Sequence, residues 1–230
     1  MTAKDTTVEV PACIYADAAP PQCSFDSLVI VIVGRAHNKK EFQVHRGLLS
    51  HYSIFFEHIL RDKSENEIAM PAEDPEVFDT ITYWMYTSRL WGPGTIKDGK
   101  IPLTVARILQ LYFFAGAKGI EALQNATMTL LYQKIVQDWE TPIQFASIIY
   151  ARTVPDSPLR RFLVDFMAEA WSFSTLETYR TTIPKDFLID LLIALTRLRK
   201  APGIGVVKAK WVQDSNKGFC EKYHSHGEQA

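Results

Sequence analysis

The spacing of hydrophobic positions divides the chain into a strand-rich start and a long helical remainder. SLVIVIVG at residues 27–34 is dense in β-branched residues and ends in glycine, which predicts a buried strand. EFQV at 41–44 alternates and predicts a second strand, paired with the first as a hairpin, and IAM at 68–70 is a short strand candidate. The sheet is therefore expected to be small and mostly antiparallel.

From residue 45 onward the hydrophobic positions recur every three or four residues, which predicts helices. Ser53 is placed to cap one of the first short helices, and Asp74 followed by Pro75 is typical of a helix start. The helical segments are expected within residues 45–61, 72–90, 103–119, 120–139, 141–151, 158–172 and 184–199. This order predicts an α+β fold: a small sheet covered by a cluster of helices, followed by an all-α C-terminal extension.

Four parts of the chain are expected. They are a flexible N-terminal segment at 1–23, the sheet-bearing domain at 24–139, the helical extension at 140–200 and an irregular tail at 201–230.

Composition and net charge limit the kinds of partner and the compartment that are expected for this chain. The chain has 230 residues, 47% of them hydrophobic and 22% charged, with a formal net charge of −1. This charge lacks the basic excess that phosphate neutralisation requires, so direct nucleic-acid binding is not expected. The most apolar run is too short to span a bilayer, and the start of the chain does not resemble a secretory signal. The three cysteines are an odd number without a disulfide spacing, which favours reduced thiols in the cytoplasm or nucleus.

The stretch FQVHRGLLSHYSIFF at residues 42–56 offers the best candidate for catalytic chemistry. His45 could act as a base with Ser50 or Ser53 as the nucleophile. Ser50 does not share a helix face with His45, however, and no strained G-x-S-x-G turn is present. A buried histidine that hydrogen-bonds the backbone and starts a helix explains the residue better, so no catalytic residue is predicted.

The tail FCEKYHSH at residues 219–226 contains metal-ligand residue types. Cys220, His224 and His226 fall within seven residues. A closed structural zinc site takes four ligands, and a fourth would have to come from Cys13, Cys23 or a carboxylate. The prediction is a polar tail without metal, with a site at these three residues as the alternative. No glycine-rich phosphate loop occurs, so no cofactor is predicted.

Five segments in order make the chain similar to a known family. They are LVIVIVG, FQVHRGLLSHYSIFF, IAMPAEDPEVFDTITYWMYTSRL, LQLYFFAGAKGIEALQNA and SPLRRFLVDF, and together they cover residues 24–170. The series resembles the BTB/POZ domain, and more closely the BTB-domain proteins of filamentous fungi. The resemblance implies a small sheet covered by helices. It also implies the signature positions of that fold: Asp26, Phe42, His45, Arg46, Leu49, Phe56, Pro75, Phe78, Trp84 and Tyr86.

Two departures from the family pattern affect what the resemblance implies. The family's acid before the first strand pairs with the basic residue after the histidine, here Arg46. Asp26 lies one position earlier than that acid, which puts the pairing in doubt. Cullin-binding members carry a hydrophobic-x-Glu motif after the first helices, and the corresponding stretch here is Ile59, Leu60 and Arg61, so the charge is reversed.

The resemblance implies a non-enzymatic protein–protein interaction module that self-associates, recruits protein partners, or both. Adapting a client to a cullin-based ubiquitin ligase is one expected role, with Ile59, Leu60 and Arg61 as candidate contacts. A transcriptional co-regulator or scaffold that dimerises without a cullin is the alternative, and an enzyme is the least favoured class.

Overall fold

The computed structural model describes residues 19–62, 64–95, 99–170, 176–198 and 207–226. Among the described residues, internal contacts define two compact units, the first ending at Gln124 and the second beginning at Asn125. Each unit has its own core, and we describe each separately.

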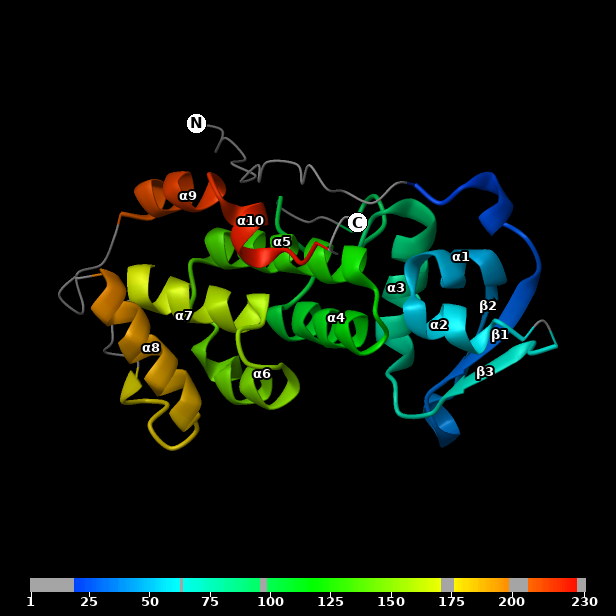
Figure 1. Cartoon of the computed structure of the whole chain (residues 1–230), viewed down its shortest axis with the longest axis horizontal. Helices are drawn as coiled ribbons and strands as arrows, with labels where there is room; N and C mark the ends of the chain where they lie inside the picture. The colour runs from blue at the N-terminus through cyan, green and yellow to red at the C-terminus, as the bar shows by residue number, and fades with distance from the viewer. Residues whose placement is uncertain (1–18, 63, 96–98, 171–175, 199–206, 227–230) are drawn as a thin grey trace. The chain divides into compact units, whose positions relative to one another are not determined.

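The sheet of the first unit has three strands in the order β2-β1-β3 (Figure 1). They are β1 (Leu28–Val33), β2 (Lys40–His45) and β3 (Glu67–Met70). β2 pairs antiparallel with β1, as the hairpin prediction required, whereas β3 pairs with β1 in parallel. The expectation of a mostly antiparallel sheet is thus wrong in one of its two pairings. The parallel strand returns through α1 and α2, which lie between β2 and β3 in the sequence.

Gly34 turns the chain out of β1. Its φ of +86° lies in the left-handed region, and an added Cβ would lie 2.5 Å from the carbonyl oxygen of Asn38. The turn continues through a short 3-10 helix, η2 (Ala36–Asn38), into β2. The glycine that closes the apolar run is therefore required by the hairpin.

Helices cover one face of the sheet. They are α1 (Arg46–Tyr52), α2 (Ile54–Ile59), α3 (Pro75–Thr87) and α4 (Val105–Ala117), and η1 (Gln22–Ser24) precedes the sheet. Ser53 and Asp74 cap α2 and α3 through their side-chain oxygens, and Pro75 occupies the first turn of α3. Both start signals were readable from the sequence, and both are confirmed.

The core of the first unit lies between the sheet and these helices. Val29, Val31 and Val33 are fully buried and point from β1 toward Phe56 and Phe78 in one apolar cluster. The alternate residues of β1 face the other way, and Leu28 and Ile30 remain 49% and 37% exposed. The prediction of a buried strand is therefore confirmed for one face of β1 and wrong for the other.

The second unit is helical. Its elements are α5 (Glu121–Asp138), η3 (Ile143–Phe145), α6 (Ala146–Arg152), α7 (Pro158–Ala170), α8 (Lys185–Leu198), α9 (Lys208–Asn216) and α10 (Phe219–Tyr223). The division between the two units falls in the first turn of α5. α6, α8, α9 and α10 all contact α7. Aromatic rings of Tyr132, Phe162, Phe219 and Trp211 pack together in its core.

The structure bears on the four predicted parts of the chain to different extents. An irregular tail was expected after residue 200, and this is wrong where α9 and α10 form, because Trp211, Phe219 and Tyr223 bury their rings in the second unit. Residues 1–18 of the expected N-terminal segment lie outside the described residues. A domain boundary at residue 139 stays a prediction.

Candidate interaction surface

An aromatic and aliphatic patch lies at the outer face of β1. We define the β1 patch as Phe25, Leu28, Ile30, His45 and Tyr86. Leu28 is the register partner of His45, so their side chains lie on the same face. The ring centroids of Phe25 and Tyr86 lie 5.6 Å and 5.8 Å from that of His45. Phe25, which precedes β1, and Tyr86, which belongs to α3, are 45% and 40% exposed, so large aromatic side chains beside β1 face solvent.

Close packing of η1 on α1 holds Phe25 in place. A Cβ on Gly47 would lie 2.8 Å from Cα of Ser24, so only glycine permits this approach. Asp26 Oδ1 accepts a hydrogen bond of 2.9 Å from the Gly47 backbone N–H. Asp26 therefore satisfies a free amide in the first turn of α1 and fixes the segment that carries Phe25.

His45 ends β2 and precedes α1, but it is not the buried, backbone-bonded histidine that the sequence suggested. It is partly exposed, and its Nδ1 lies 2.7 Å from the hydroxyl oxygen of Tyr86. The same hydroxyl oxygen accepts a 3.2 Å bond from the His45 backbone N–H. The imidazole is thus engaged by a tyrosine of α3, and this contact links the strand to the helix inside the β1 patch.

Arg46 holds the segment that follows α2. Its guanidinium donates to the carbonyl oxygens of Leu60, Asp62 and Glu65, at 3.1 Å and 3.3 Å for the first two. The Asp62 carboxylate accepts from the backbone N–H and hydroxyl of Ser64, and these bonds, with the nearby Arg46 charge, lower the pKa of Asp62. Arg46 therefore orders the turn behind the candidate cullin contacts.

The three candidate cullin contacts differ in accessibility. Leu60 is only 5% exposed and belongs to the core cluster, and Ile59 is half-buried against the same cluster. Arg61 alone is exposed. A partner at this position would therefore meet the arginine head group and one edge of Ile59.

A family model decides what kind of domain carries these features. The model described as "BTB/POZ domain" matches residues 25–115. The chain contains a BTB/POZ domain. Among solved structures, the BTB domain of zebrafish PATZ1 is similar at 22% sequence identity and a TM-score of 0.35, over 46% of this chain and 75% of that one. No curated protein matches the chain.

The remaining signature positions of the BTB/POZ domain serve its packing. Phe42, Leu49, Phe56, Phe78 and Trp84 are all at most 8% exposed. Phe78 contacts Phe42 and Phe56 edge-on, with centroids 5.0 Å and 6.4 Å apart. These residues position the patch and cannot themselves contact a partner.

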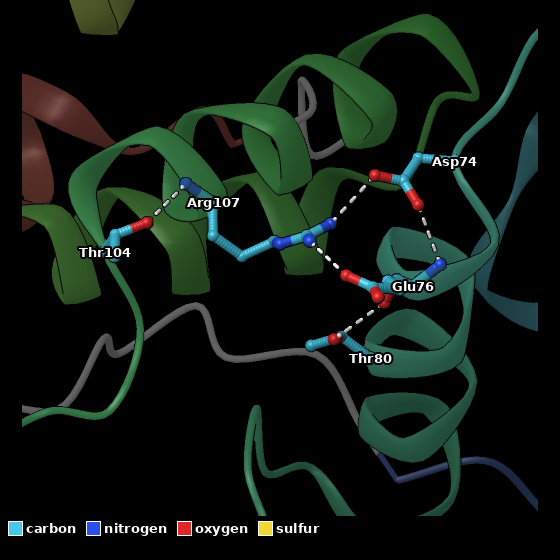
Figure 2. Close-up of polar contacts among 5 residues, drawn as sticks. All are labelled: Asp74, Glu76, Thr80, Thr104 and Arg107. Carbon is cyan, nitrogen blue, oxygen red and sulfur yellow. Dashed lines mark hydrogen bonds and ion pairs between the residues drawn. The ribbon is translucent and has the colours of Figure 1, made fainter.

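The acidic residues at the start of α3 form ion pairs with basic side chains. Figure 2 shows Arg107 of α4 between Asp74 and Glu76, at 3.1 Å and 2.6 Å from their carboxylate oxygens. Asp74 also caps α3 by accepting from Glu76 N at 2.8 Å, and Glu73 pairs with Lys118 at 3.2 Å. This arrangement stabilises the start of α3 against α4, and Asp74 forms the helix cap that the sequence predicted.

The C-terminal cysteine and histidines lie together in the second unit. The ligand atoms of Cys220, His224 and His226 are all within 4.8 Å of one another. Burial, and secondarily the charge of His226, lower the pKa of His224 to about 4, so its imidazole is neutral at pH 7. Of the cysteines considered as a fourth ligand, Cys23 is exposed in the first unit and Cys13 lies outside the described residues.

Two features of the surface were missed from the sequence. Phe25 precedes the apolar run and gave no periodic signal, and the exposed face of β1 could not be recognised because the run is apolar at every position.

In the second unit, α8 exposes an apolar face: Leu188, Ile189, Leu192 and Ile193 are between 38% and 63% exposed. No described helix is both long and apolar enough to cross a membrane.

Proposed function

We propose that this chain is a scaffold that self-associates through the β1 patch of its BTB/POZ domain and recruits a protein partner through its helical C-terminal part. The BTB/POZ domain is a protein–protein interaction module. The observation that carries the self-association proposal is the exposure of Phe25, Leu28, Ile30 and Tyr86 on one rigid surface.

The chemistry of the β1 patch supports this role. Aromatic and large aliphatic side chains dominate the binding energy of interfaces when they are rigidly presented. Tyr86 combines an apolar ring with a hydroxyl that is already bonded to His45, so its polar end needs no partner when the ring is covered.

The strand edges are less suited to self-association than the face. β2 is an edge strand that carries Lys40 and Glu41, and β3, at the other edge, has only four residues. Charged side chains and short length are the usual means by which edges avoid pairing with another sheet. We therefore assign self-association to the face of β1.

Molar-mass determination by light scattering across a concentration series tests this proposal. Leu28→Lys places a charge in the patch at a 49% exposed position, so folding should be unaffected. Ile54→Lys makes the same kind of change at a 74% exposed residue outside the patch and serves as control. We expect the wild type and I54K to associate and L28K to need at least about tenfold higher concentration. Equal association of all three proteins would sink the proposal.

Cullin recruitment is a second candidate, favoured by the exposure of Arg61 directly after α2. Calorimetry with the N-terminal region of the BTB-partner cullin tests it. The proposal requires micromolar or tighter binding that Arg61→Ala, which removes the exposed head group, weakens at least about tenfold. A folded protein that gives no heat and no complex rules out the cullin role and leaves the self-associating scaffold.

The proposal also includes a binding site for a partner protein and a cellular compartment. The exposed apolar face of α8 supports partner binding by the helical extension, and the reduced cysteines Cys23 and Cys220 support a cytosolic or nuclear location. A non-enzymatic role is proposed because His45, the candidate base in the sequence, is hydrogen-bonded to the hydroxyl of Tyr86. A dimerising co-regulator would use the same β1 patch without a cullin.

A further inference from the structure

Local geometry brings three metal-ligand side chains together at the end of the second unit. Cys220 and His224 are four residues apart, and the His224 backbone N–H still donates to the Cys220 carbonyl at 3.0 Å, so both side chains lie on one face of α10. His224 then adopts an extended conformation, with φ −95° and ψ 148°. In an extended segment, residues two apart point the same way, which turns His226 toward the same side.

Helix α5 fixes this arrangement from the opposite side. Asn125 binds the backbone of Ser225 with two hydrogen bonds, 2.6 Å to its carbonyl and 2.8 Å from its N–H. One turn along α5, the Thr129 hydroxyl lies 2.8 Å from Nε2 of His224. A residue that contacts the outer nitrogen of a histidine in this way orients the ring and leaves its second nitrogen for a ligand.

That second nitrogen has no protein partner. Nδ1 of His224 is a buried side-chain atom without a hydrogen-bond partner among the described residues. Buried polar atoms are rarely left unpaired, because burial without a partner costs free energy. A purely internal hydrogen bond between Cys220 Sγ and His226 Nε2, which lie 3.3 Å apart, explains two members of the cluster but not His224.

We propose that Cys220, His224 and His226 bind one zinc ion through Sγ, Nδ1 and Nε2, with a water molecule as the fourth ligand. A tetrahedral ion with usual zinc–sulfur and zinc–nitrogen bonds keeps its ligand atoms about 3.3–3.6 Å apart. The Cys220–His226 separation of 3.3 Å is within this range, and one ligand atom from each of the three residues lies within 4.8 Å of the other two. Binding deprotonates the Cys220 thiol and releases that proton to solvent.

The ion joins parts of the second unit that local sequence does not connect. It ties α10 to the segment after it, and through Asn125 and Thr129 it ties both to α5. We therefore assign the site a structural role in holding the C-terminal segment on α5. A ligand from a partner protein can displace the water molecule at the fourth position.

Titration of the full, reduced, metal-free chain with Co²⁺ and then Zn²⁺ tests the proposal. A cysteine–histidine site gives tetrahedral cobalt bands in the visible and a thiolate-to-cobalt charge-transfer band in the near ultraviolet. We expect one ion per chain, with Zn²⁺ displacing Co²⁺ and both spectral features lost on displacement.

Variants separate this site from adventitious binding. Cys220→Ser should abolish the charge-transfer band and weaken Zn²⁺ binding at least about 100-fold, and Thr129→Val should weaken it about 10- to 100-fold by freeing the His224 ring. Cys23→Ser, which removes an exposed cysteine of the other unit, should change neither. A wild type without cobalt bands, or a folded C220S protein that binds Zn²⁺ as tightly as wild type, overturns the proposal.

Discussion

Asn125 and Ser225 lie one hundred residues apart and share two hydrogen bonds through one side-chain amide. The donor and the acceptor of the amide are both used, so the side chain replaces the neighbouring strand that an extended segment would otherwise need. The contact explains why residues after α10 are held in place although they form no helix.

Asn125→Ala should therefore release the C-terminal segment. It removes both bonds and leaves two backbone groups of Ser225 without partners, which we expect to cost about 1–3 kcal/mol. Asn125→Asp keeps the acceptor for the Ser225 N–H and loses the donor, so its effect should be intermediate. Hydrogen exchange of the Ser225 amide measures this directly. Equal exchange rates in wild type and N125A would show that the pair does not hold the segment.

Ser53 forms a second long-range contact, which joins the start of α2 to the end of α4 in the first unit. It is 1% exposed, its hydroxyl donates to the Lys118 carbonyl at 2.6 Å, and the same oxygen accepts from Phe56 N at 3.1 Å. Ser53→Ala leaves both groups unpaired, and we expect a loss of about 1–3 kcal/mol in the free energy of unfolding. Ser50→Ala, in α1, should stay within about 0.5 kcal/mol. Urea denaturation of the two variants distinguishes them, and matching midpoints would contradict the assignment.

Local signals in the sequence were sufficient to predict most helices and strands of this fold, but not α9 and α10. The caps at Ser53 and Asp74, Pro75 after the second and the helical spacing after residue 103 act over one or two turns, so they are readable without a structure. The parallel pairing of β3 was not readable, because IAM carries no mark of its direction and gains it only from the return through α1 and α2.

The candidate sites depend on contacts between residues that lie far apart in the sequence, and the sequence alone does not predict which of these residues meet. His45 meets Tyr86 41 residues away, and His224 meets Thr129 95 residues away. Cys220, His224 and His226 were visible in the sequence as three metal-ligand residue types within seven residues. The unpaired Nδ1 of His224, which strengthens the case for a metal site, exists only in the packed structure. Outward exposure of Leu28 was hidden because both faces of β1 are apolar in sequence.

Arg107 should stabilise the first unit through geometry as well as charge. It contacts Asp74 and Glu76 with separate nitrogens, and its side chain is only 23% exposed (Figure 2). Arg107→Met should cost about 1–2 kcal/mol, and Arg107→Lys should recover little because one ammonium cannot span both acids.

An exposed pair supplies the control for Arg107. Arg180 and Glu177 form an ion pair with side chains 77% and 81% exposed. Arg180→Met should change the free energy of unfolding by less than about 0.5 kcal/mol, because such pairs are screened by solvent. Chemical denaturation at low and high salt compares the two, and an R107K protein as stable as wild type would refute the two-acid argument.

Alkaline pH should unfold the second unit. Burial raises the pKa of Tyr132, Tyr150 and Tyr223 above the ordinary value of 10.0, and for the latter two hydrogen bonds to Asp190 and Asp165 raise it further. The folded state thus holds these protons more tightly than the unfolded state. This contribution to stability is complete below pH 10 and is lost as pH rises above 10 toward the folded-state pKa values.

A jump to high pH measures this effect by tyrosinate absorbance. Solvent-accessible rings should ionise within the mixing time, and the three buried rings should ionise only at the rate at which helicity is lost. Tyr223→Phe should lower the amplitude of the slow absorbance change, since it removes one of the buried hydroxyls of the second unit. If the slow absorbance change is absent, or if its amplitude is unchanged in Y223F, the buried tyrosines do not couple alkaline ionisation to unfolding of the second unit.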